Sequence, residues 1–122
     1  MTEDRAERAA VRGQQAADRR NEAAERSRQL ADRLDELRAG GPSDPESIRA
    51  AEEAAERSAM HAQEAHEAAA LAHDEAARRH LEAAEQAERL GRPEEAQRHR
   101  EAAAADDDAA VADRAAGREG PD

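Results

Sequence analysis

Three consecutive seven-residue repeats run from His66 to Gln86, and they constrain the fold more than any other feature of the sequence. The repeats read HEAAALA, HDEAARR and HLEAAEQ, so each begins with histidine and has alanine at its fourth and fifth positions. A spacing of seven brings side chains back to the same face of an α-helix that packs against another helix. The pattern therefore predicts packing of helix on helix.

The apolar residues are too small to build a thick core. Of 46 hydrophobic residues 35 are alanine, and the chain has no Phe, Tyr or Trp. Burying an alanine methyl group gains roughly 0.8 kcal/mol, against about 1.5–3 kcal/mol for a Leu or Ile side chain. Ala, Glu, Leu and Arg, which all favour helix, make up 79 of the 122 residues. The composition therefore predicts long helices that meet along thin interfaces.

Glycine and proline divide the chain into three predicted helices within a single domain, at residues 1–39, 45–90 and 93–116. A Gly-Gly-Pro turn and an N-cap occupy residues 40–44, with Asp44 as the cap and Pro45 as the first helical residue. Ser43 with Glu46 is an alternative capping box. Residues 91–92 form the second turn, and residues 117–122 are expected to be a disordered tail. The expected fold is all-α, an elongated three-helix antiparallel coiled coil with one very long central helix.

Each predicted helix carries a stripe of residues at alternating spacings of three and four. The first stripe consists of Ala9, Gly13, Ala16, Arg20, Ala23, Ser27, Leu30, Leu34 and Leu37. In the third helix the best stripe is Ala102, Ala105, Ala109, Ala112 and Ala116. We expect the first and third helices to overlap along residues 66–80 of the central helix. The stripe of the central helix, which we name the interaction seam, consists of Ile48, Ala55, Ala62, His66, Ala69, His73, Ala76, His80, Ala83 and Leu90.

His66, His73 and His80, which we call the histidine ladder, lie in this seam without a carboxylate three or four residues away. Three interpretations stay open: the rings simply fill space, they form a contact that responds to pH, or they bind a metal ion. Neighbouring ladder positions are roughly 10.5 Å apart along a helix, so one ion cannot join two of them. The metal candidates are His66, His73, His80 and His99, and any site needs ligands from another helix, such as His99 or the run at residues 106–108.

The remaining histidines and the aspartate run are expected on the solvated surface. His61 has Glu64 three residues later, and His99 has Glu95 four residues earlier, as is typical of an exposed helix face. The run Asp106-Asp107-Asp108 lacks the alternation and the glycine of a calcium loop. We therefore interpret it as solvated charge.

Charge and composition argue against several classes of function. The net charge is −11, and no aromatic side chain is present for base stacking, so nucleic acid is not an expected partner. No apolar run is long enough for a membrane span, and the chain has no Cys, which together indicate a cytoplasmic protein. No nucleophile–base pattern or phosphate-binding glycine loop occurs, so neither an enzyme nor a cofactor is expected.

Two resemblances follow from the residue pattern. Residues 80–108, with Leu90-Gly91 before Pro93-Glu94-Glu95-Ala96, resemble a single tetratricopeptide hairpin and imply a helix hairpin. The whole chain is similar to small Ala/Glu/Arg-rich helical proteins with histidine heptads from high-GC actinobacteria, a resemblance that implies an origin rather than a function. A looser similarity to late-embryogenesis-abundant proteins rests on the hydrophilic, Ala/Glu-rich composition.

These observations favour a non-enzymatic helical interaction or scaffold protein that acts through coiled-coil packing. Its partner would be another protein or a second copy, meeting the interaction seam around Ala62–Ala87. The first alternative is a stress-protective chain that folds conditionally. The second is a module in which the histidine ladder responds to pH or metal.

Overall fold

The computed structural model describes residues 2–40 and 44–118, and within these ranges the chain forms three α-helices. Helix α1 comprises Thr2–Ala39, α2 comprises Pro45–Arg89 and α3 comprises Pro93–Arg118. The prediction of an all-helical chain is therefore confirmed. Gly117 and Arg118 belong to α3 and not to the predicted tail. Ser43 of the alternative capping box lies outside the described residues.

Local signals explain where α2 begins and ends. The Asp44 carboxylate accepts a hydrogen bond from the backbone N–H of Glu46 at 3.4 Å, and Pro45 begins the helix. At the other end Gly91 adopts the left-handed region with φ 73°. The amide of Gly91 donates to the carbonyl of Glu88, and the amide of Arg92 donates to that of Ala87. This pair of bonds is the Schellman motif, and it turns the chain into α3.

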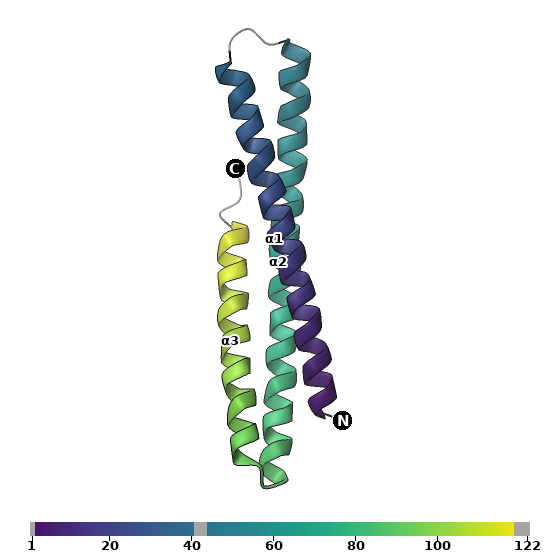
Figure 1. The fold of residues 1–122 in the computed structure, drawn as a ribbon, viewed down its shortest axis with the longest axis vertical. Coiled ribbons are helices and arrows are strands. Elements are labelled where there is room, and N and C mark those ends of the chain that lie inside the picture. The colour runs from purple at the N-terminus through teal and green to yellow at the C-terminus, as the bar shows by residue number, and fades with distance from the viewer. Residues whose placement is uncertain (1, 41–43, 119–122) are drawn as a thin grey trace.

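Helix α2 packs against both other helices, and the chain reverses direction at each turn (Figure 1). The ion pair between Arg38 and Glu52 joins α1 to α2 near the first turn. Arg114 with Asp74, and Arg100 with Glu88, join α3 to α2 along its other half. The middle of α2 therefore has a helix on two sides.

Alanine fills most of the space between the helices. Every buried apolar residue in the described chain is alanine except Leu34, whose exposed fraction is 9%. Small side chains let helix axes approach closely, but each methyl group adds only about 0.8 kcal/mol. Six of the larger apolar residues are exposed on the surface, namely Val11, Met60, Leu71, Leu81, Leu90 and Val111.

The predicted stripe of α3 is wrong by one residue. Ala105 and Ala112 are exposed, whereas Ala96, Ala103 and Ala110 are buried. Alanine occupies both candidate stripes, so apolar character alone did not distinguish them. The stripe that packs against α2 also contains His99, Asp106 and Asp113, which made it look polar in the sequence.

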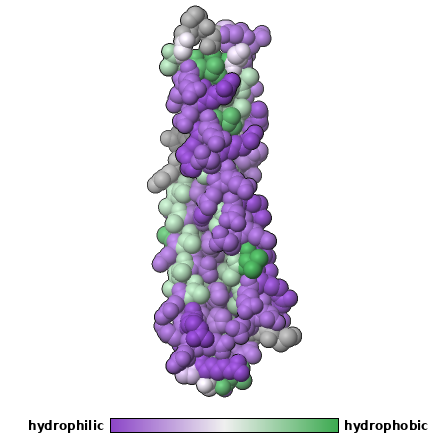
Figure 2. Space-filling view, in the orientation of Figure 1, coloured by the Kyte–Doolittle hydropathy of each residue, from purple (hydrophilic) through white to green (hydrophobic). Residues whose placement is uncertain are grey.

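Most of the face shown in Figure 2 is hydrophilic, as expected from the charge of −11. Apolar surface appears on it near the end that carries the first turn, and in further patches along the bundle. None of the three described helices has an apolar stretch long enough to cross a membrane.

Candidate functional site

The histidine ladder faces α3, where residues at the same spacing of seven meet it. His80 lies against His99, His73 against Asp106, and His66 against Asp113. Each step of seven up α2 corresponds to a step of seven down α3 because the two helices run in opposite directions. The ladder rings are mostly buried, with side-chain exposures of 13–18%. The polar partners that the ladder lacks on its own helix are therefore supplied by α3.

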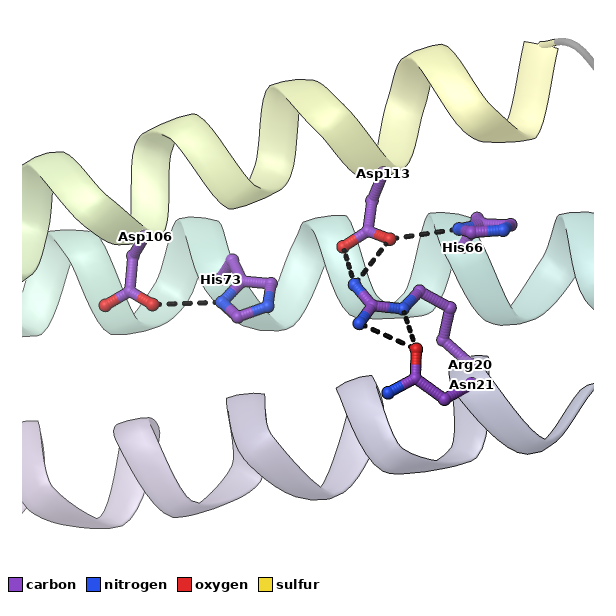
Figure 3. Close-up of polar contacts among 6 residues, drawn as sticks. All are labelled: Arg20, Asn21, His66, His73, Asp106 and Asp113. Atoms are coloured by element: carbon purple, nitrogen blue, oxygen red, sulfur yellow. Dashed lines mark hydrogen bonds and ion pairs between the residues drawn. The ribbon is translucent and has the colours of Figure 1, made fainter. Parts of the chain in front are cut away.

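His73 and His80 share the carboxylate of Asp106. Nδ1 of His73 lies 2.9 Å from Oδ1, as Figure 3 shows. Nε2 of His80 lies 3.9 Å from Oδ2. On the α1 side, a Cβ atom built on Gly13 would lie 3.6 Å from Nδ1 of His73, so the backbone of α1 passes close to this ring. Asp106 is thus an interhelical contact and not solvated charge, which corrects the expectation for this residue; Asp107 and Asp108 are exposed.

Asp113 is the most deeply buried charged side chain in the described chain, with an exposure of 2%. Its carboxylate accepts two bonds from Nη1 of Arg20, at 2.9 and 3.0 Å, and lies 3.0 Å from Nδ1 of His66. Arg20 also donates to the side-chain oxygen of Asn21 (Figure 3). This group ties all three helices together, since Arg20 is on α1, His66 on α2 and Asp113 on α3.

His99 is mostly buried, with 13% side-chain exposure, although the sequence indicated a solvated face. Its Nδ1 lies 2.9 Å from Nδ1 of His80, and the two rings are tilted, with centroids 5.2 Å apart. Its Nε2 lies 3.9 Å from a carboxylate oxygen of Glu3 on α1. His61, in contrast, is exposed as predicted. A continuous polar line therefore runs from Glu3 through His99, His80 and Asp106 to His73.

Burial lowers the pKa of His80 from its ordinary value of 6.5. The nearby His99 ring acts in the same direction, while the Asp106 carboxylate opposes the shift. His80 is thus held preferentially in its neutral form, in which one ring nitrogen can accept a hydrogen bond and the other can donate one.

The structure places the predicted interaction seam mainly inside the chain's own bundle. Ala69, Ala76 and Ala83 are buried, the three ladder histidines are partly buried, and Leu90 is exposed. Ile48, Ala55 and Ala62 are partly exposed near the first turn. The middle of the seam is covered by α1 and α3 in this structure, and the docking of a partner around Ala62–Ala87 stays a prediction.

Sequence reasoning missed Glu3 and Asp113 as members of the polar network. It placed Asp106 on the solvated surface and kept the run at residues 106–108 only as a possible source of metal ligands. One signal was present, because Arg20 falls in the α1 stripe, and a buried arginine requires a carboxylate partner. A second signal was the spacing of seven residues between His99, Asp106 and Asp113, because it matches the spacing of the histidine ladder.

The polar network joins the three helices, and its histidine and carboxylate side chains also carry atoms that can bind a proton or a metal ion. Within the described residues, no buried side-chain nitrogen or oxygen lacks a hydrogen-bond partner. A fully satisfied buried network fixes the register of the helices that share it. Comparison with protein-family models, curated proteins and solved structures found no match for this chain.

Proposed function

We propose that the chain is a non-enzymatic helical interaction protein that acts through coiled-coil packing. In this proposal the fold is an elongated antiparallel three-helix coiled coil with α2 as its long central helix. The docking surface is the groove between α1 and α2 at the two-helix end, which we define as residues 24–39 of α1 and 45–62 of α2. Its occupant is the same end of a second copy, so that two pairs of helices form a four-helix bundle.

The observation that carries this proposal is a groove between α1 and α2 that the described part of α3 does not cover. A Cβ atom on Gly117 would lie 3.5 Å from Cβ of His66 and 3.9 Å from the carbonyl of Gln63, and α3 ends one residue later. Among the described residues, only α1 and α2 continue beyond this point. A groove of about 520 Å³ lies between them, lined by Ser27, Arg28, Ala31, Leu34, Asp35, Arg38, Glu52, Ala55, Glu56 and Ala59. Figure 2 shows apolar surface near this end of the bundle.

Charge favours a second copy as the occupant. The α1 side of the groove carries Arg28 and Arg38 with Asp35 between them, while the α2 side carries Glu52 and Glu56. A two-fold axis parallel to the helices places the α1 side of one copy against the α2 side of the other, so the arginines of each copy meet the glutamates of its partner. Ala31 and Ala55, with the remaining exposed edges of Leu34 and Ala59, supply the apolar centre. In a heptad arrangement such charged flanks select orientation while the apolar stripe supplies most of the affinity.

Sedimentation equilibrium tests self-association, with the wild type compared with Ala31→Glu. Ala31 is exposed and lines the groove, so a carboxylate there would be buried beside the partner's acidic side. We expect a concentration-dependent dimer for the wild type and a dimer weakened about tenfold or more for this variant. Ala50→Glu is the matched control, because Ala50 is exposed but does not line the groove. A wild type that is monomeric up to submillimolar concentration refutes self-association.

A further inference from the structure

We propose that Glu3, Glu95 and His99 form a binding site for a divalent transition-metal ion, with His80 as the residue that orients His99. One ligand atom from each of the three residues lies within 4.8 Å of the other two. They line a small cavity of about 110 Å³ together with Ala83, Gln86, Ala87, Leu90 and Arg92. This inference is independent of the proposed dimer, because the cavity lies at the opposite end of the bundle.

The three ligands come from two helices that are far apart in the sequence. Glu95 and His99 are four residues apart on α3, so their side chains share one face of the helix. Glu3 reaches the same point from the first turn of α1, and its side chain is about half exposed. Metal–ligand bonds of about 2.0–2.2 Å require the ligand atoms to move closer together. Glutamate side chains can supply this movement by changing rotamer, without displacement of a helix.

The ring of His99 is held as a metal-binding histidine requires. Ligating histidines commonly donate their second ring N–H to a neighbouring acceptor, which fixes the tautomer and the ring orientation. Nε2 of His99 is the nitrogen near Glu3, and Nδ1 lies 2.9 Å from Nδ1 of His80. If Nδ1–H of His99 donates to neutral His80, Nε2 of His99 is left with a free lone pair. The N–H of His80 is then on Nε2, which faces Asp106 at 3.9 Å.

The donor set determines which class of ion fits. One imidazole nitrogen with two carboxylate oxygens suits zinc and similar transition metals, whereas Ca²⁺ and Mg²⁺ prefer oxygen ligands throughout. Three protein ligands leave a position for water. Two carboxylates and a neutral histidine also balance the charge of a divalent cation. Arg92 competes with the ion, since its guanidinium lies 3.7 Å from the Glu95 carboxylate.

Bound metal would fasten the start of α1 to the hairpin of α2 and α3. At this end a long contact from Glu3 to His99 links α1 to α3. An ion that binds only the folded chain raises its apparent stability in proportion to the logarithm of the ion's concentration above its Kd. The melting temperature should therefore rise with Zn²⁺.

Titration calorimetry and thermal melting of the full chain with Zn²⁺ test the site at neutral pH. We expect one equivalent of Zn²⁺ to bind and to raise the melting temperature. His99→Ala should weaken binding by about 100-fold or more, and Glu3→Gln and Glu95→Gln by about tenfold each. His80→Leu should weaken it roughly 10–100-fold, since it removes only the orienting acceptor. Arg92→Ala should tighten binding, because the competing cation is gone.

His61→Ala is the matched control, because His61 is an exposed histidine on α2 and should leave binding unchanged. If His99→Ala does not fold, Glu3→Gln decides the question, since Glu3 is half exposed and its loss does not disturb the core. Failure of Zn²⁺ to bind the wild type overturns the site. Equal binding to the wild type and to Glu3→Gln also overturns it. An equal rise in melting temperature with Mg²⁺ points to general screening of acidic charge and overturns it as well.

Discussion

Replacing Asp113 with alanine is expected to destabilise the fold strongly, because this carboxylate pairs with Arg20 of α1 and with His66 of α2. Its exposure is 2%, and it contacts Arg20 twice and His66 once at 2.9–3.0 Å. Removing one member of a buried ion pair costs about 3–5 kcal/mol when the other charge is left without a partner. Arg20 is 22% exposed and can recover some hydration, so we expect about 2–3 kcal/mol.

Thermal melting by circular dichroism measures this cost. For a chain of this length the expected fall in melting temperature is on the order of 10 °C. Asp108→Ala is the matched control, since it removes the same charge from an exposed position of the same helix. Both substitutions replace aspartate with alanine and raise helix propensity equally. The difference in melting temperature between the two variants therefore isolates the lost contacts. Equal melting temperatures for Asp113→Ala and Asp108→Ala would refute this role for Asp113.

A triple variant separates lost pairing from lost packing. Changing Arg20, His66 and Asp113 together to leucine removes all the charge at once and leaves no unpaired group. Buried ion pairs replaced by apolar side chains are often neutral or stabilising. We therefore expect the triple variant to melt above Asp113→Ala.

Three further outcomes follow from the structure. Gly13→Ala should stabilise the chain by about 0.5–1 kcal/mol in urea unfolding, because the new Cβ makes an ordinary contact at 3.6 Å with His73 and helix propensity improves; a loss of stability would contradict the spacing of α1 and α2. Gly91→Ala should destabilise by about 1 kcal/mol, since φ at Gly91 is 73°, while the helical Gly117→Ala should not. In buffer with a metal chelator, the lowered pKa of His80 means that the unfolded chain binds this proton first as the pH falls through 6.5. Stability from neutral His80 is complete above that pH and decreases below it, so the wild type should lose stability relative to His80→Gln between pH values of about 7.5 and 5.5; parallel pH curves would contradict the shift.

Local signals mark both ends of α2 and the start of α3. Asp44 before Pro45 and Gly91 before Pro93 act through backbone geometry within a few residues, so they can be recognised without knowing the tertiary structure. The stripe of α1 was also readable, because Leu30, Leu34 and Leu37 mark one spacing, although Ala17 beside that stripe is buried as well.

The site depended on information that local patterns do not contain. Asp106 and Asp113 pair with ladder histidines on another helix, and that pairing depends on the register between α2 and α3. With alanine on both candidate stripes of α3, apolar periodicity favoured the wrong one. The position of Arg20 in the α1 stripe was the clue that a carboxylate from another helix had to meet it. The spacing of seven from Asp113 back to Asp106 and His99 then matches the spacing of the histidine ladder.

The pairing of the histidine ladder with α3 is tested most directly by a double-mutant cycle between His73 and Asp106. The two side chains are 2.9 Å apart and both mostly buried. Unfolding free energies of His73→Ala, Asp106→Ala and the double variant should give a coupling energy of about 1–2 kcal/mol. The same cycle between His73 and exposed Asp107 should give a value near zero. Equal coupling in both cycles, or none in the first, would contradict the interhelical register on which the whole site depends.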